Sequence, residues 1–273
     1  MAREEALISP ARVYDLTFRW AFAGCLFLLL LLTTAVLASD ALYLTWREFL
    51  VGLLRKETLW AVELSLITST VTAALAVLVG IPAAYALSRF RLPGSLLLDT
   101  ILDLPIVLPP AIMGISLLVF FYMPYGKWLE ARGLEFVYTR QGIVLAQFVV
   151  AAPFCVRALK AAFDNIDPRL EGVARTLGCS RVRAFWKVTL PLAKSGLIAG
   201  AIMTWARAVG EFGPILFFVG TEPTKAGVMP IRIFLDMSIG QVESALTMVL
   251  IMLAIGTLAL LAFKKLGGRG YLW

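Results

Sequence analysis

Arg207 and Glu211 are ionisable residues four positions apart in the otherwise apolar stretch Ser195–Val219. Helical spacing would place both side chains on one face. Inside a membrane each such charge costs about 2.5–3.5 kcal/mol on insertion scales, so it normally faces a protein interior or water. Two roles fit the pair. Arg207 would give positive potential to a passage for anions while Glu211 orients it, or the two would neutralise each other and lock helices together.

Proline residues interrupt a second apolar stretch, Leu96–Tyr122, where Pro109 and Pro110 are followed by Gly114. Proline removes an amide donor and breaks helical hydrogen bonding. Non-helical backbone at membrane depth is tolerated where it is buried in protein or lines a cavity. These three residues are therefore candidates for a translocation pathway or gate, and a plain proline kink packed against neighbouring helices is the alternative.

A basic loop at about 164–192 is the third candidate site. Asp167-Pro168 is typical of a helix start, and Gly178 is placed to end that helix. One apolar stripe would run along it through Leu170, Val173, Ala174 and Leu177. Ser180 would cap a second short helix, which Pro191 would close. Such an amphipathic basic element fits a groove on a partner protein; a loop lying on anionic lipid is the alternative.

Polar side chains also occur near two apolar stretches. Hydroxyl groups crowd the second stretch at Ser65, Thr68, Ser69, Thr70 and Thr72. They either line a polar route or bond to the preceding turn or a neighbouring helix. Asp99 and Asp103, near the start of the third stretch, are expected to pair with basic loop residues.

Several kinds of chemistry are excluded by what the chain lacks. It has no histidine, and Cys25, Cys155 and Cys179 show no metal-ligand spacing. It has no G-x-x-x-x-G-K-[ST] for ATP and no H-E-x-x-H or G-x-S-x-G for hydrolysis. We therefore expect no metal, no cofactor and no enzymatic activity.

The composition is that of a membrane protein, with 60% hydrophobic and only 16% charged residues and a mean hydropathy of +0.86. About 20 apolar residues cross a bilayer. The sequence predicts an all-α membrane protein, a single domain over 1–273, with six spans: Trp20–Ala38, Leu59–Leu87, Leu96–Tyr122, Ile143–Phe163, Ser195–Val219 and Ala245–Phe263.

The net charge of +7 is explained by topology and not by a nucleic-acid partner. With the segment 1–17 inside, Lys and Arg are roughly twice as frequent on inner as on outer segments. This bias predicts that both termini are cytoplasmic.

The loop Leu170-Glu171-Gly172-Val173-Ala174-Arg175-Thr176-Leu177-Gly178, followed by Val188-Thr189-Leu190-Pro191, resembles the cytoplasmic loop of prokaryotic ABC importer permeases of type I. Gly80–Arg89 is similar to their second span. Leu104–Pro110 and Arg207–Gly213 resemble the molybdate, tungstate and sulfate branch. That family usually carries Glu-Ala-Ala at the positions where this chain has Gly172-Val173-Ala174. Glu171, one position earlier, would then make the acidic contact with the ATPase.

This resemblance implies a multi-pass cell-membrane permease with a coupling helix between spans four and five. A cytoplasmic ABC ATPase dimer would dock on residues 170–175, 177 and 178. An external binding protein would meet the loops 40–57, 123–140 and 220–240. A second copy would complete a homodimer in the lipid.

The implied function is import of a tetrahedral oxyanion, molybdate or tungstate ahead of sulfate, powered by the separate ATPase. The alternatives are a permease for another solute such as an amino acid or phosphate, a channel or carrier that needs no ATPase, and a purely structural membrane subunit.

Overall fold

Helices are the regular secondary structure of the described residues, and short turns and loops connect them. The computed structural model describes residues 10–90 and 92–266, with side chains placed between 18 and 262. The elements are α1 (Pro10–Tyr43), α2 (Trp46–Leu53), α3 (Lys56–Arg89), α4 (Ser95–Val107), α5 (Pro110–Tyr122), α6 (Pro124–Glu130), α7 (Arg140–Asp164), α8 (Arg169–Thr176), α9 (Arg181–Ala184), the π-helix η1 (Phe185–Thr189), α10 (Leu190–Leu192), α11 (Lys194–Val209), α12 (Gly213–Phe218), α13 (Pro223–Ala226), α14 (Met229–Ser238) and α15 (Val242–Leu266).

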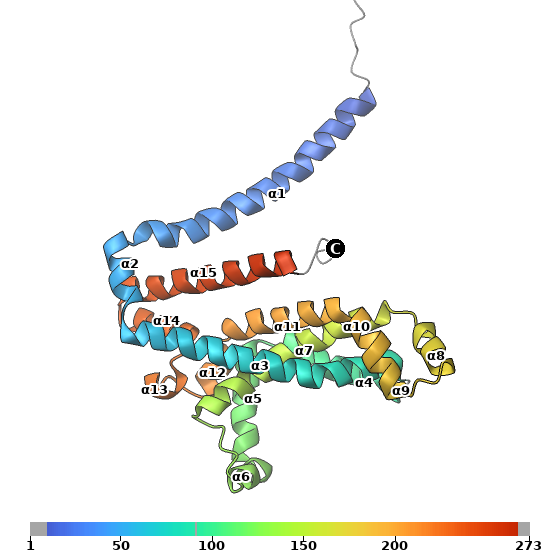
Figure 1. Cartoon of the computed structure of the whole chain (residues 1–273). Coiled ribbons are helices and arrows are strands. Elements are labelled where there is room, and N and C mark those ends of the chain that lie inside the picture. Colours follow the sequence, from blue (N-terminus) through green and yellow to red (C-terminus); the bar gives the residue numbers. More distant parts are fainter. Residues whose placement is uncertain (1–9, 91, 267–273) are drawn as a thin grey trace, which may run out of the picture.

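The core of the molecule is a layer in which α3, α7 and α11 pack side by side (Figure 1). Small buried side chains such as Ala76 on α3 and Cys155 on α7 allow these helices to approach closely. A second apolar cluster joins α5, α7, α12 and α14 through Phe121, Ile143 and Phe218. The layer extends from the α2 end of the molecule to the α8 end, which lie at opposite sides of Figure 1.

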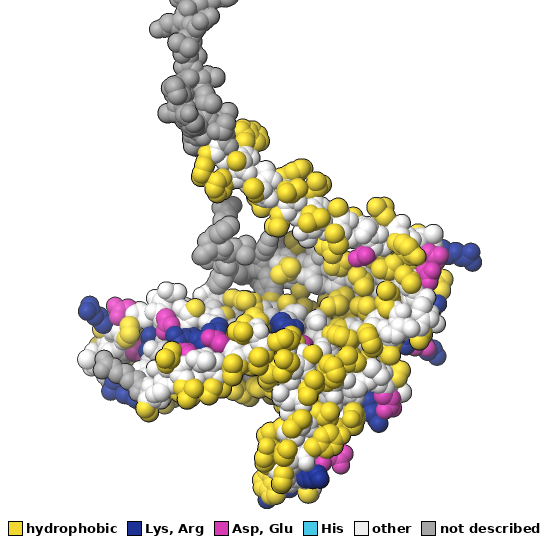
Figure 2. All heavy atoms as spheres, turned by 180° about the vertical axis from the view of Figure 1, so that it is seen from behind, with side chains coloured by type: hydrophobic (Ala, Val, Ile, Leu, Met, Phe, Trp, Pro, Cys, Tyr) yellow, Lys and Arg dark blue, Asp and Glu magenta, His cyan; other side chains and the backbone are white. Residues whose placement is uncertain are grey.

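Four helical segments are long and apolar enough to cross a membrane: Phe18–Tyr43, Lys56–Arg89, Arg140–Asp164 and Val242–Ala262. They correspond to the expected first, second, fourth and sixth spans. Two bent helix pairs, α4 with α5 and the segment Arg181–Leu192 with α11, bring the number to six if each pair is one span. Hydrophobic side chains cover most of the face in Figure 2, and charged side chains gather mainly toward its ends.

The third and fifth spans differ from the uninterrupted stretches that the sequence predicts. In the third, α4 and α5 meet at 112° around Leu108-Pro109. In the fifth, α11 ends at Val209 and α12 begins only at Gly213, so Glu211 lies in the break and not on the helix with Arg207. Gly210 and Pro214 explain the second break, because glycine disfavours helix and proline lacks the amide donor.

The first span stands apart from the rest of the described chain (Figure 1). Its most apolar window is 0% buried, and α1 begins at Pro10, before the expected start at Trp20. Residues 1–9 of the expected N-terminal segment 1–17 lie outside the described residues. A helix that is this apolar and has no buried residue in that window needs lipid or a partner as its surroundings.

The hydroxyl groups of the second span bond within the protein. Ser69 donates to the Ser65 carbonyl oxygen at 2.7 Å, and the Ser65 hydroxyl accepts from the Met229 amide at 2.8 Å. Thr72 donates to the side-chain oxygen of Gln147 at 3.0 Å. Thr68 and Thr70 are likewise bonded. These bonds correspond to the second of the two expected roles, attachment to the preceding turn or a neighbouring helix.

Asp99 and Asp103 both pair with one basic residue, Arg157, which the structure places on helix α7. Arg157 of α7 donates to Asp99 Oδ1 at 2.8 Å and to Asp103 Oδ1 at 2.6 Å. The bidentate guanidinium thereby fixes α4 on α7.

Candidate functional site

The short helix α8 forms as the sequence predicts, because both of its ends are capped. At its start the Arg169 amide donates to Asp167 Oδ1 at 2.9 Å. At its end the Gly178 amide donates to the Arg175 carbonyl and the Cys179 amide to the Ala174 carbonyl. This is a Schellman motif. It requires the left-handed backbone of Gly178, whose φ is +88°.

The apolar stripe of α8 faces outward. Leu170 is 46% exposed, Val173 58% and Leu177 80%, and Val182 and Trp186 beyond the helix are exposed as well. Basic residues flank this stripe: Arg169, Arg175, Arg181 and Arg183. The amphipathic helix is thus inverted with respect to its own protein, since its polar Glu171 faces inward and its hydrophobic residues face out. Exposed apolar surface with a polar rim is typical of a protein interaction site.

Glu171 is therefore not available for the external acidic contact that the resemblance implies. Its side chain is 13% exposed. It accepts hydrogen bonds from Tyr85 and Thr189, each at 2.7 Å, and from Arg89 at 3.3 Å. Burial opposes ionisation of this carboxyl, but the bonds from Tyr85, Thr189 and Arg89 outweigh it and lower the pKa of Glu171. The one sequence signal for these partners is the spacing of Tyr85 and Arg89, which are four positions apart and therefore lie on the same face of a helix.

The second half of the loop differs from the single helix that was predicted. Ser180 does cap α9, accepting from the Arg183 amide at 3.3 Å. The chain then continues through the π-helix η1 into α10, and Pro191 lies inside α10. Proline is tolerated there because it occupies the first turn of a helical segment. The chain bends by 70° only between Leu192 and Lys194.

The broken third and fifth spans pack directly on each other. A Cβ atom added to Gly114 of α5 would lie 2.6 Å from Pro214 Cα of α12. One added to Gly213 would lie 2.9 Å from the Ala111 backbone nitrogen. The structure thus brings Pro109, Pro110 and Gly114 next to the break after α11. These glycines allow a close approach between two short helices that end at non-helical backbone.

Arg207 and Glu211 form an ion pair across that break. Arg207 Nη1 lies 2.5 Å from Glu211 Oε2, and the side chains are 28% and 2% exposed respectively. A buried carboxylate needs such a partner. This geometry is compatible with the role in which the two charges neutralise each other. The Arg207 side chain nevertheless remains partly exposed. Beside it, Gln147 donates to the Ala208 carbonyl at 3.0 Å.

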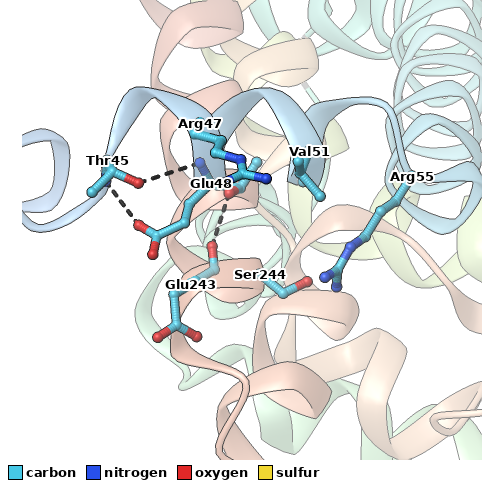
Figure 3. A pocket seen from close by; sticks show the side chains of 9 residues that line it. Thr45, Arg47, Glu48, Val51, Arg55, Glu243 and Ser244 are labelled. Atoms are coloured by element: carbon cyan, nitrogen blue, oxygen red, sulfur yellow. Dashed lines mark hydrogen bonds between the residues drawn. The ribbon is translucent and has the colours of Figure 1, made fainter.

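The opposite end of the molecule carries open cavities. One of about 410 Å³ lies between α2 and the start of α15 (Figure 3). Its wall includes Arg47, Arg55 and Glu243. Thr45 and Glu48 cap α2 reciprocally: the Glu48 amide donates to the Thr45 hydroxyl, and the Thr45 amide donates to the Glu48 carboxylate. Hydrogen bonding with Thr45, its side chain first, lowers the pKa of Glu48. Another cavity, of about 340 Å³, is lined by Lys56, Trp60, Arg140 and Arg232 among others.

Comparison with known proteins identifies the family of this chain. Residues 76–269 match the family described as "Binding-protein-dependent transport system inner membrane component". The sulfate transport system permease protein CysT of Escherichia coli K12 is 30% identical over 244 residues, which cover 89% of this chain and 88% of that protein. The molybdenum transport system permease protein ModB of the same organism is 37% identical over 207 residues, 74% of this chain and 90% of that protein. The molybdate/tungstate permease protein WtpB of Thermococcus kodakarensis is 37% identical over 201 residues, 74% and 76% of the two chains.

Solved structures support the fold. A bacterial alginate ABC transporter in complex with an alginate-bound periplasmic protein matches with a TM-score of 0.73 at 17% identity, over 94% of this chain and 98% of that one. The MetNI methionine ABC transporter matches with a TM-score of 0.59 at 20% identity, over 78% and 98%. The expected all-helical permease architecture is thereby confirmed. The family match covers well over half of the residues, and this chain belongs to the binding-protein-dependent inner-membrane components, the permease subunits of ABC importers.

Proposed function

We propose that this permease forms the pathway for a tetrahedral oxyanion, molybdate or tungstate ahead of sulfate. Its relatives are named as molybdate, tungstate or sulfate permeases. An anion passing through a membrane needs positive potential, which a partly exposed Arg207 beside the broken backbone at 210–212 would supply. Pro109, Pro110 and Gly114, opposite that break, would act as the gate.

The energy for transport comes from a separate cytoplasmic ATPase dimer that docks on α8. The observation that carries this proposal is the outward apolar stripe of Leu170, Val173 and Leu177. An exposed stripe of this kind on a short capped helix fits a groove of another protein. The chain itself would catalyse no covalent reaction.

A second copy of the chain completes the assembly. None of the apolar window of α1 is buried within the described chain, and a two-fold homodimer would offer one coupling surface to each ATPase subunit. The α8 end and both termini would be cytoplasmic in the cell membrane. The α2 end, with its open cavities, would receive an external binding protein. Residues 1–273 act as one permease domain.

The test is uptake of labelled molybdate into proteoliposomes that contain the permease, the partner ATPase and the binding protein. We expect ATP-dependent uptake, competition by tungstate, weaker competition by sulfate and none by amino acids or phosphate. An ATPase without its P-loop lysine serves as control.

Three outcomes would contradict the proposal. Competition by an amino acid or phosphate alone would assign another cargo. Uptake without the ATPase would indicate a channel or carrier. Absence of any uptake from an intact complex would indicate a structural subunit.

A further inference from the structure

The inward face of α8 is attached to the end of a long span by one carboxylate. Tyr85 donates its hydroxyl hydrogen to Glu171 Oε2 at 2.7 Å, while Thr189 and Arg89 donate to Oε1 at 2.7 Å and 3.3 Å. We call Glu171, Tyr85, Arg89 and Thr189 the Glu171 cluster. Its members come from α8, from the last turns of α3 and from the π-helix η1. One side chain therefore joins three elements.

The surroundings of the Glu171 cluster exclude most of the water. Thr189 is 0% exposed, and the Arg89 side chain is 10% exposed. The Tyr85 ring packs edge-on against Phe163 at 5.7 Å and Phe185 at 4.8 Å between ring centroids. Hydrogen bonds to a charged group are stronger than neutral ones, and low local dielectric strengthens them further. This attachment is consequently firmer than an exposed surface contact.

The end of α3 is fixed to the neighbouring span by separate bonds. Arg89 also donates to the Ile166 carbonyl at 2.7 Å, and Ser88 donates to Asp164 Oδ1 at 2.6 Å. The backbone of α8, in contrast, packs mainly on η1 and α9. Since η1 and α9 belong to the same loop, Glu171 provides the direct charged link from α8 to a membrane span. With 34 residues, α3 extends about 51 Å at 1.5 Å per residue and ends near the cavities at the α2 end.

We propose that Glu171 is a positioning residue that transmits movement of α8 to α3. The inference rests on the proposed function, in which an ATPase grips the outer face of α8. A displacement of α8 would pull α3 through the Glu171 cluster and so reach the opposite end of the bundle. Without the carboxylate, the ATPase would still bind the outward stripe and hydrolyse ATP, but less of the movement would reach α3.

The experiment compares variants of the complete complex with the ATPase in proteoliposomes. Glu171→Ala removes all three bonds of the carboxylate, while Tyr85→Phe and Thr189→Val each remove one hydroxyl and keep the packing. Thr176→Ala is the matched control, because Thr176 is exposed on the same helix and bonds only to the Val173 carbonyl of that helix. The measured quantities are ATPase bound per permease, ATP hydrolysed and oxyanion taken up per ATP.

We expect Glu171→Ala to bind the ATPase as well as the parent protein does. Oxyanion uptake per ATP should fall about fivefold or more, the lower range of typical coupling effects. Tyr85→Phe and Thr189→Val should each cause a smaller fall. Neither should have a further effect in a Glu171→Ala background, because the shared partner is already absent. Thr176→Ala should match the parent protein.

Two results would overturn the inference. One is unchanged uptake per ATP in Glu171→Ala, and the other is loss of ATPase binding, which would make Glu171 a determinant of the docking surface. If Glu171→Ala does not fold, unchanged coupling in both hydroxyl variants would overturn it equally. Failure of the proposed function is distinguishable, because the parent protein itself would then lack ATPase binding or ATP-dependent uptake.

Discussion

Replacement of Gly114 by alanine tests the close contact between the broken spans. The added Cβ would lie 2.6 Å from Pro214 Cα and 2.8 Å from its carbonyl oxygen, and both are backbone atoms that no rotamer change can move. Reaching ordinary contact at 3.4 Å needs an opening of about 0.8 Å between α5 and α12. Overpacking of this kind costs about 1–3 kcal/mol, and the helix-favouring effect of alanine returns roughly 0.5–1 kcal/mol.

The expected net loss of stability is about 0–2.5 kcal/mol, centred on about 1 kcal/mol, which lowers Tm by about 2–4 °C at the centre of that range. Thermal unfolding of the detergent-solubilised protein measures it, and ATP-dependent uptake should fall as well, because the proposed gate is displaced. Gly172→Ala is the matched control: no atom lies within 4 Å of its added Cβ, so the same substitution in helix α8 should be neutral or slightly stabilising. A Gly114→Ala protein as stable as the parent and equally active would refute the assignment of this contact.

Three further predictions concern the loop and its supports. Gly178→Ala should weaken ATPase co-purification, because the φ of +88° costs a non-glycine residue about 1–2 kcal/mol; undiminished co-purification would contradict this. Arg157→Ala should destabilise the protein by about 0.5–2 kcal/mol, since it removes two partly exposed ion pairs that contribute about 0.2–1 kcal/mol each; in thermal unfolding, adding Asp99→Asn and Asp103→Asn should restore part of that loss. The lowered pKa of Glu171 means that its contribution is complete above the ordinary value of 4.5 and is lost as pH falls through the folded-state pKa. The Tm difference between the parent and Glu171→Gln should therefore be constant from about pH 6 to about pH 8 and shrink below pH 4.5; a difference that shrinks near neutrality would count against the bonds described.

The inverted orientation of α8 lets one short helix bind its own protein through Glu171 and still expose its apolar residues. Its apolar residues are free for a partner because its acidic residue already has three donors within the chain. In an isolated soluble protein such exposure would be an aggregation hazard. In the proposed complex with the ATPase this exposed stripe would be the docking surface.

Local patterns were sufficient to predict much of this protein from the sequence. Apolar stretches of bilayer length predict helical spans. The bilayer core contains no water, so the backbone amides and carbonyls must bond to one another within the helix. Asp167, Ser180 and Gly178 predict helix ends because capping involves only neighbours along the chain. The loop and span motifs likewise predict the family, which the comparisons confirm.

Only the tertiary structure decided which way each polar side chain points and what it meets. Periodicity places Glu171 off the apolar stripe but does not show that this side faces inward, because Tyr85 and Thr189 are distant in sequence. The same is true of Arg157 with Asp99, and of Gly114 with Pro214. Helical periodicity also suggested that Arg207 and Glu211 share a helix, whereas the chain breaks between them. Capping and span length follow from nearest neighbours; ion pairs and close contacts depend on how distant segments pack.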